Sequence, residues 1–272
     1  MNRVQLMEIA KVYLPTPVQN HIRSYLQRWR EPAREIDLSY LRFIRQAKRE
    51  DLADPKWLES MLPRLGLNSE WLQQFPSSLY RYTGKGLRHW QYPNQFSKYL
   101  AQLAHCKIES YLEIGVRHGG TFAITVEYLN RFHPVKKALG VDIRPCPGLA
   151  EYKKTNPCVR FEVLDSQTPG FQQLVEAEGP FDLVLIDGDH SEEGCRRDFE
   201  NLKHHARILV FHDIVSSPVP GVGKVWEEVK EREKDNFDFF EYTDQYDEVV
   251  HRRNETLLGI GVAVRKSSGS LH

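Results

Sequence analysis

Apolar residues from position 93 onward alternate between short continuous runs and longer stretches with helical spacing. The short runs predict buried strands over residues 111–116, 138–143, 159–164, 181–186 and 207–211. The stretches between them place apolar side chains three and four residues apart, as in Phe122, Val126 and Leu129, and this spacing predicts helices. Strands that alternate with helices favour a parallel sheet covered on both faces.

Two more strands are predicted near the end of the chain, over residues 237–242 and 257–264. In the second run, Leu258, Ile260, Val262 and Val264 alternate with other residues. This alternation predicts an antiparallel strand whose two faces differ in burial. The pattern therefore predicts an α/β fold in which a mostly parallel sheet ends in an antiparallel strand.

The first 92 residues follow a different pattern, which predicts a helical N-terminal region ahead of a domain formed by residues 93–272. Asp54-Pro55 is typical of a helix start, with a cap residue followed by proline at the first helical position. We expect this region to serve packing or homo-oligomer formation. The basic and aromatic residues 80–92 predict a loop or lid over the site. Binding of single-stranded nucleic acid is the weaker alternative for that loop.

Composition narrows the class of protein without selecting a function. The 272 residues carry 37 basic and 37 acidic side chains, which gives no electrostatic case for binding nucleic acid or an anionic membrane. No apolar run approaches the ~20 residues of a membrane span, and residues 1–8 lack the apolar core of a signal peptide. The four cysteines are scattered and predict reduced thiols. We therefore expect a cytoplasmic protein.

The chemistry-bearing stretch is Tyr111–Phe122, in which a predicted strand runs through a glycine turn into a helix. This is the front half of a nucleotide-binding βαβ unit. Dinucleotide sites prefer the pattern G-x-G-x-x-G, but Arg117 stands where the middle glycine would be. Glu113, an acidic residue inside the strand, suits a cationic ligand better than a pyrophosphate.

This stretch resembles motif I of the class I S-adenosylmethionine-dependent methyltransferases. Along the chain it is followed by Gly-Val-Asp, Leu-Asp-Ser, Ile-Asp-Gly-Asp-His and Phe-His-Asp. The last two blocks resemble small-molecule methyltransferases related to the cephalosporin and macrolide-sugar tailoring enzymes, and more distantly the catechol O-methyltransferases. The resemblance covers about residues 93–265. It implies a Rossmann-like, seven-stranded sheet and S-adenosylmethionine as the methyl donor.

Cofactor contacts are expected at the carboxyl ends of the first three strands. Asp142 ends the second strand, where an acid can accept both ribose hydroxyls, although a turn aspartate is the alternative. Thr121 and the helix N-terminus are suited to the cofactor carboxylate. The resemblance implies that cofactor contacts come from Glu113, Gly115, Val116, Gly119, Thr121, Asp142, Asp165 and Ser166. For Asp165 and Ser166, a side-chain turn explains the pattern nearly as well.

Asp187 and Asp213 follow the fourth and fifth strands, which the resemblance makes neighbours in the sheet. Because adjacent strands lie ~4.8 Å apart, the two carboxylates are placed to share a cation, and oxygen ligands favour Mg²⁺ or Ca²⁺. The resemblance implies a third ligand at His212, where the relatives usually have an oxygen ligand. A hydrogen-bonding cap at Asp187 and simple packing of His212 are the alternative.

His190 stands where the catechol-type enzymes carry a lysine that takes the substrate proton, and histidine suits that task near neutral pH. With Asp187 it forms the expected catalytic pair, although a cap or surface role is equally compatible. The predicted activity is O-methylation of a small hydroxylated acceptor such as a sugar, a phenol or a natural product, assisted by Mg²⁺.

Two other functions compete with methyl transfer. One is an NAD-dependent oxidoreductase, against which the glycine spacing and the terminal strand 257–264 argue. The other is a non-catalytic module that keeps the fold and binds a partner through its N-terminal helices. The row of acidic residues at successive strand ends argues against this second alternative.

Overall fold

The computed structural model describes residues 33–266. From Arg34 onward the chain forms one compact unit. The predictions for the first 32 residues, which include part of the helical N-terminal region, lie outside the described residues, as does the tail 267–272. The predicted division of the chain at residue 92 stays a prediction.

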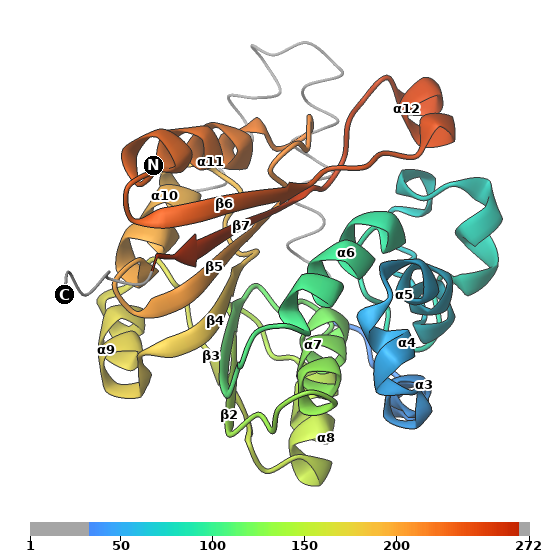
Figure 1. The fold of residues 1–272 in the computed structure, drawn as a ribbon, viewed down its shortest axis with the longest axis horizontal. Helices are drawn as coiled ribbons and strands as arrows, with labels where there is room; N and C mark the ends of the chain where they lie inside the picture. The colour runs from blue at the N-terminus through green and yellow to red at the C-terminus, as the bar shows by residue number, and fades with distance from the viewer. Residues whose placement is uncertain (1–32, 267–272) are drawn as a thin grey trace, which may run out of the picture. The chain divides into compact units, whose positions relative to one another are not determined.

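Within the described residues, one seven-stranded sheet has the strand order β3-β2-β1-β4-β5-β7-β6 (Figure 1). The strands are β1 (Ser110–Ile114), β2 (Lys137–Asp142), β3 (Val159–Val163), β4 (Phe181–Ile186), β5 (Ala206–His212), β6 (Phe237–Tyr242) and β7 (Ile260–Arg265). The first five pair in parallel, whereas β7 pairs antiparallel with both β5 and β6. The predicted sheet with its antiparallel end is therefore confirmed.

The strand β7 corrects one expectation, because both of its faces are buried. Ile260 and Val262 pack into the core on one side of the sheet, and Ala263 packs into the core on the other side. A β-carbon added to Gly261 would lie 2.7 Å from the Trp226 ring. The alternation in the sequence predicts unlike faces, but β7 lies inside the sheet between β5 and β6, so helices cover it on both sides.

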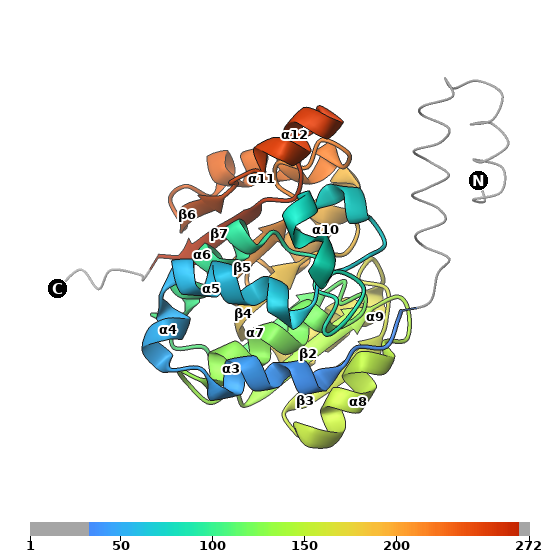
Figure 2. The ribbon, with the colours of Figure 1, turned by 90° about the vertical axis from the view of Figure 1, so that its right-hand side faces the viewer.

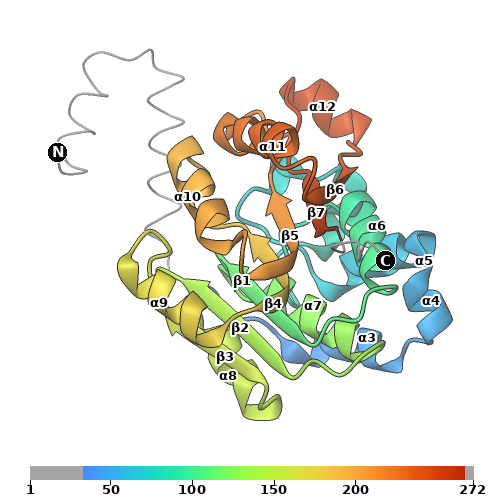
Figure 3. The same cartoon turned by 60° about the vertical axis from the view of Figure 1, so that its left-hand side comes forward.

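Helices cover the two faces of the sheet (Figures 1 and 3). One face is covered by α6 (Pro93–Leu103), α7 (Gly120–Asn130) and α8 (Pro147–Thr155), and the other by α9 (Pro169–Glu178), α10 (Glu192–Leu202) and α11 (Pro220–Arg232). The helix predicted over residues 93–103 is confirmed with both of its ends. Two helices were not predicted, α8 and α12 (Asp247–Arg253), because each buries few side chains and so shows little helical pattern.

The described part of the N-terminal region is built from short helical segments packed beside α6 and α7 (Figure 2). They are α3 (Arg42–Gln46), α4 (Arg49–Ala53), α5 (Pro55–Met61) and the 3₁₀ turns Leu38–Leu41, Leu62–Leu65, Leu72–Gln74 and Ser77–Tyr82. The predicted cap is present, since Asp54 Oδ1 accepts a hydrogen bond from the Lys56 amide at 2.9 Å. The helix α5 is followed directly by the 3₁₀ turn Leu62–Leu65, which carries Pro63 near its start.

An ion pair between a half-exposed arginine and a buried glutamate joins this region to the sheet domain. Arg45 on α3 donates two hydrogen bonds to Glu127 on α7, at 2.9 Å from Nε and 2.6 Å from Nη2. The Tyr152 hydroxyl on α8 donates a third, at 2.8 Å. Each oxygen of the Glu127 carboxylate therefore has a donor, which is the condition for a buried charge to be tolerated.

Candidate active site

The turn after β1 needs glycine because backbone from two other segments packs against it. Gly115 has a φ of 86°, and an added β-carbon would lie 2.0 Å from the Asp187 carbonyl oxygen. An added β-carbon at Gly120 would lie 1.9 Å from the carbonyl oxygen of Leu87. The first contact places the turn directly beside the loop that follows β4. The second brings the loop 80–92, the predicted lid, against the first turn of α7.

Glu113 lies under this turn and is only 1% exposed. The Tyr111 hydroxyl donates a hydrogen bond of 2.5 Å to its Oε2. Burial raises the pKa of Glu113 to about 8, and the nearby charges of Asp187 and Asp142 act in the same direction. The carboxyl is therefore more deeply placed than the sequence suggests, yet it is close enough to Asp142 and Asp187 to respond to their charge.

Asp142 ends β2 at the same edge of the sheet, where its carboxylate braces the glycine turn. Its Oδ2 accepts a hydrogen bond from the Arg117 amide at 2.9 Å, and its Oδ1 accepts one from the Arg144 amide at 3.0 Å. Two bonds leave lone pairs on both oxygens, since a carboxylate offers about four acceptor positions. The two backbone amides thus fix the orientation of the Asp142 carboxylate, and ribose binding at Asp142 stays a prediction.

Asp165 and Ser166 show the side-chain turn that the sequence left as an alternative. Asp165 Oδ1 accepts a hydrogen bond from the Gln167 amide at 2.9 Å, which closes an Asx turn. The Gln167 side chain then bonds Asp198 on α10 at 2.8 Å and Ser166 Oγ at 3.2 Å. The turn fixes the loop after β3 against α10. Contact with a cofactor at these two residues stays a prediction.

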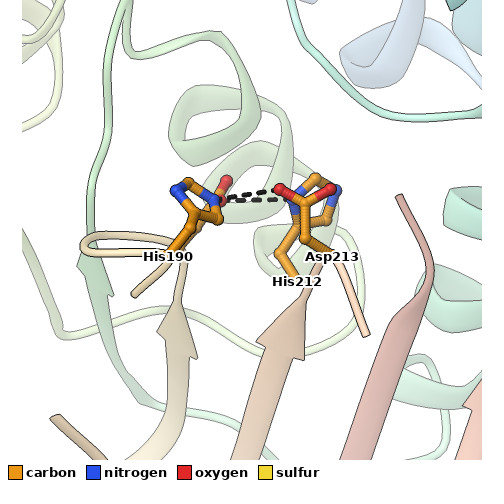
Figure 4. Close-up of side chains that lie close together, drawn as sticks. His190, His212 and Asp213 are labelled. Atoms are coloured by element: carbon orange, nitrogen blue, oxygen red, sulfur yellow. Dashed lines mark hydrogen bonds and ion pairs between the residues drawn. The ribbon is translucent and has the colours of Figure 1, made fainter. Parts of the chain in front are cut away.

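Four side chains from the ends of β4 and β5 converge into one cluster, which we call the His–Asp cluster: Asp187, His190, His212 and Asp213. Figure 4 shows three of them, His190, His212 and Asp213. His190 Nε2 lies 3.1 Å from Asp187 Oδ1 and 3.0 Å from Asp213 Oδ2. His212 Nδ1 lies 3.2 Å from Asp187 Oδ1 and 3.7 Å from Asp213 Oδ2. The proposed catalytic and metal-binding residues are thus brought together, and their roles stay predictions.

Local backbone geometry explains why these residues meet. The parallel pairing of β4 with β5 puts Ile186 opposite Phe211, so the residues that follow both strands emerge at the same edge. Asp213 has a φ of 67°, an unusual left-handed conformation for a residue other than glycine. The chain turns sharply there, and the Asp213 side chain is directed back toward His190 (Figure 4).

Opposite charges dominate the electrostatics of the cluster. Burial disfavours a charged imidazole, but hydrogen bonds to Asp187 and Asp213 outweigh burial and raise the pKa of His190 to about 9. For His212 the same opposition between burial and the two carboxylates raises the pKa to about 10. Although burial acts in the other direction, the two histidines hold the pKa of Asp213 well below its usual range. The cluster therefore balances two imidazolium groups against two carboxylates.

The donor set of the His–Asp cluster matches Mg²⁺ poorly. Mg²⁺ requires oxygen ligands in near-ideal octahedral geometry, whereas imidazole nitrogen suits Zn²⁺, Fe²⁺ and similar cations. Here two buried imidazoles face the same carboxylate oxygens that Mg²⁺ would need. The donor atoms lie within 4.8 Å of one another, which is close enough to surround one ion. Mg²⁺ as the bound cation stays a prediction.

Two residues near the turn were missed by the sequence reasoning. Glu70 is bonded to Arg117 Nη2 at 2.8 Å and lies 3.0 Å from His118 Nε2, so it fixes the glycine turn from the N-terminal region. No sequence signal links residues 47 positions apart. Ile143 follows Asp142 and is 40% exposed, near Val163 at 54%. An apolar residue directly after the acid that ends β2 was a readable signal in the sequence.

A family model matches the central part of the chain. Residues 112–214 match the family model described as a methyltransferase domain. This segment begins in β1 and ends just beyond Asp213, so it contains the glycine turn, Asp142 and the whole His–Asp cluster. No curated protein sequence matches the chain.

Several solved structures are similar to this chain. The MycE methyltransferase from the mycinamycin biosynthetic pathway, in complex with Mg, SAH and mycinamycin VI, is 20% identical over 69% of this chain and 53% of its own, with a TM-score of 0.44. The O-methyltransferase TomG from Streptomyces achromogenes, with SAM, is 16% identical over 66% and 82%, with a TM-score of 0.47. The O-methyltransferase from Bacillus cereus, with SAH, is 14% identical over 81% and 92%, with a TM-score of 0.45. The chain spans about half the length of the MycE chain.

The seven-stranded sheet has the strand order given above, and residues 112–214 within it match a methyltransferase domain. The methyltransferase domain that the sequence predicts is therefore confirmed over that segment. Across the described residues, no helix combines the length and the apolar character needed to cross a membrane.

Proposed function

We propose that this protein transfers the methyl group of S-adenosylmethionine to a hydroxyl oxygen of a small acceptor, with His190 as the general base. The observation that carries this proposal is the position of His190 Nε2 between Asp187 Oδ1 and Asp213 Oδ2, at 3.1 and 3.0 Å. A base must be oriented before it can act, and here two carboxylates orient one ring.

The carboxylates also select the tautomer of the base. Because the two carboxylates raise the pKa of His190 to about 9, the ring acts as a base only in its neutral form, whose fraction grows as the pH rises toward 9. In that form Nε2–H is donated to Asp187 and Asp213, and Nδ1 accepts the proton. An acceptor hydroxyl that gives its proton to this ring leaves an imidazolium, and both carboxylates stabilise that charge. The oxygen then attacks the methyl carbon in line with the departing sulfur. The sheet edge contributes positioning of oxygen against carbon.

The methyl donor would lie across the ends of β1 and β2. Asp142 is placed to accept the ribose hydroxyls, and Ile143 offers an apolar surface to the adenine. Gly115 brings backbone within contact of the Asp187 loop, so a donor seated over this turn places its methyl group beside the His–Asp cluster. No step in this scheme requires Mg²⁺, and the proposed acceptors are sugars, phenols and hydroxylated natural products.

A transfer screen tests this proposal. Purified full-length protein would be incubated with S-adenosylmethionine labelled with tritium in its methyl group, together with sets of sugars, phenols and peptides. We expect label on a hydroxylated small molecule and none with the His190→Gln variant. Label on peptides alone, or equal transfer by the variant, would contradict the proposal. Binding of the donor with no labelled acceptor in any set would favour the non-catalytic alternative.

A further inference from the structure

The His–Asp cluster contains a histidine at a position that decides which metal it can hold. His212 is the last residue of β5, is 3% exposed, and turns Nδ1 toward the carboxylates of Asp187 and Asp213. Each of these three side chains offers one donor atom, and these atoms and that of His190 all lie within 4.8 Å of one another. A cation there would have two oxygen ligands and one nitrogen ligand from the protein.

We propose that this site selects a divalent cation that accepts imidazole nitrogen, such as Zn²⁺, Fe²⁺ or Co²⁺, over Mg²⁺, with Asp187, His212 and Asp213 as its protein ligands. The inference rests on the proposed function, because the cation would face the same acceptor hydroxyl. It goes beyond that function because it names the kind of metal and the residue that selects it.

Distances among the three proposed ligands agree with compact coordination. His212 Nδ1 lies 3.2 Å from Asp187 Oδ1 and 3.7 Å from Asp213 Oδ2. Ligands at 2.0–2.1 Å from a tetrahedral ion are separated by about 3.3 Å, so these two separations are close to those of ligands on one ion. Three protein ligands with one open position is the arrangement of catalytic rather than structural zinc sites.

Donor chemistry supplies the selectivity. Mg²⁺ keeps its waters and binds through oxygen, so a buried imidazole adds little to its free energy of binding. Zn²⁺, Fe²⁺ and Co²⁺ form strong bonds to imidazole. Once His212 has released its proton, two carboxylates and a neutral imidazole match the charge of one divalent ion, so the ion and its three protein ligands carry no net charge. Replacing His212 with an oxygen donor should therefore move the preference toward Mg²⁺.

The experiment measures binding of single metals to the full chain after treatment with a chelator. Co²⁺ and Mg²⁺ would be titrated by calorimetry into the wild type, the variants His212→Glu and His212→Gln, and the control His251→Glu, which makes the same change at an exposed histidine. Because Co²⁺ binds most sites more tightly than Mg²⁺, the informative quantity is the change in the ratio of the two affinities.

We expect one Co²⁺ per chain, and a ratio that falls on the order of 10- to 100-fold in His212→Glu but stays constant in His251→Glu. Pulsed electron paramagnetic resonance of Mn²⁺ bound to the wild type gives a second readout, which does not depend on a variant that folds. It should show one directly bonded imidazole nitrogen.

Other outcomes separate this inference from the proposed function. Absence of a directly bonded nitrogen, or an unchanged affinity ratio in both variants at position 212, would overturn the inference. If S-adenosylhomocysteine binds but no metal binds stoichiometrically, the inference fails while the proposed function stands. Nitrogen couplings from two imidazoles would support the metal assignment but remove His190 from its role as base.

Discussion

Two ionic clusters in this protein each hold a buried carboxylate and are built differently. The Arg45–Glu127–Tyr152 joint pairs one cation with one anion, and each carboxylate oxygen receives a donor within 2.9 Å. In the His–Asp cluster, two imidazoles share the same two carboxylate oxygens at 3.0–3.7 Å. Among the described residues His212 Nε2 has no hydrogen-bond partner. In the first cluster, each carboxylate oxygen has its own hydrogen-bond donor. In the second cluster, two imidazoles share carboxylate oxygens, and one ring nitrogen lacks a hydrogen-bond partner among the described residues.

This difference separates a structural contact from a chemical one. A complete pair holds two elements together and gains nothing from a further ligand. A cluster in which two imidazoles share the same carboxylate oxygens, placed at the carboxyl ends of parallel strands, can take up a proton, an ion or a substrate oxygen. Substitutions in the first cluster should therefore change stability, and substitutions in the second should change activity.

The largest effect is expected for His190→Gln. This variant keeps a polar side chain of similar length but removes the base, so the methyl-transfer rate should fall about 10²- to 10⁴-fold. Its melting temperature and its affinity for S-adenosylhomocysteine should stay close to those of the wild type. Rates measured on an acceptor found in the screen, with His251→Gln as the control, check this. Wild-type rates in His190→Gln would rule out a base at this position.

Gly115→Ala should reduce stability and cofactor binding together, because the added β-carbon would lie 2.0 Å from the Asp187 carbonyl and φ is +86°. Left-handed strain and the clash together should cost about 2–4 kcal/mol. Gly170→Ala is the matched control, since its nearest neighbour would be 3.6 Å away. Urea unfolding and titration with S-adenosylhomocysteine measure both effects. Equal behaviour of the two variants would mean that the Gly115 turn is not tightly packed.

Arg45→Met tests the structural side of the comparison. Removing the guanidinium leaves Glu127 buried with only the Tyr152 hydroxyl, so the free energy of unfolding should fall by about 1–3 kcal/mol. Transfer activity below the melting temperature should be unchanged. The exposed Arg42→Met is the control, with an expected effect within about 0.5 kcal/mol. A loss of activity without a loss of stability would contradict the assigned role of this joint.

The smallest expected effect is the loss, at low pH, of the contribution that ionised Glu70 makes to the free energy of unfolding. Burial opposes ionisation, but His118 and Arg117 outweigh it and lower the pKa of Glu70 from 4.5 to about 2. Its contribution is therefore complete above about pH 4.5 and is lost as the pH falls toward 2. Glu70→Gln should lower stability by about 1–2 kcal/mol at pH 7 and less at pH 3. Melting temperatures across this range, with the exposed Glu50→Gln as the control, test the difference. A deficit that stays constant with pH would contradict it.

The sequence predicted the sheet well because its strands are short apolar runs separated by helices with strong spacing. The ends of α6 were predictable from Pro93 and from the inward-facing residues Phe96, Leu100 and Leu103. The helix α12 was not, because only Val249 among its seven residues is buried. Burial on both faces of β7 could not be predicted from the sequence either, because it depends on where the strand is inserted in the sheet.

The site was predictable where residues follow strand ends, and not where distant segments meet. Asp187, His212 and Asp213 could be grouped because neighbouring parallel strands bring their carboxyl ends together. The contact of Glu70 with Arg117 depends on how the N-terminal region packs, which leaves no periodic trace in the sequence. The depth of Glu113 was also missed, because a strand residue shows its face only after the covering helices are known.

Calorimetric titration of the full chain with S-adenosylhomocysteine tests the central claim most directly, because it requires no knowledge of the acceptor. We predict one binding site per chain, no binding of NADH, weaker binding of S-adenosylhomocysteine by Asp142→Asn, and unchanged binding by His190→Gln. Failure of the wild type to bind S-adenosylhomocysteine, or tight binding of NADH in its place, would contradict the proposal that a methyl donor lies between the glycine turn and the His–Asp cluster.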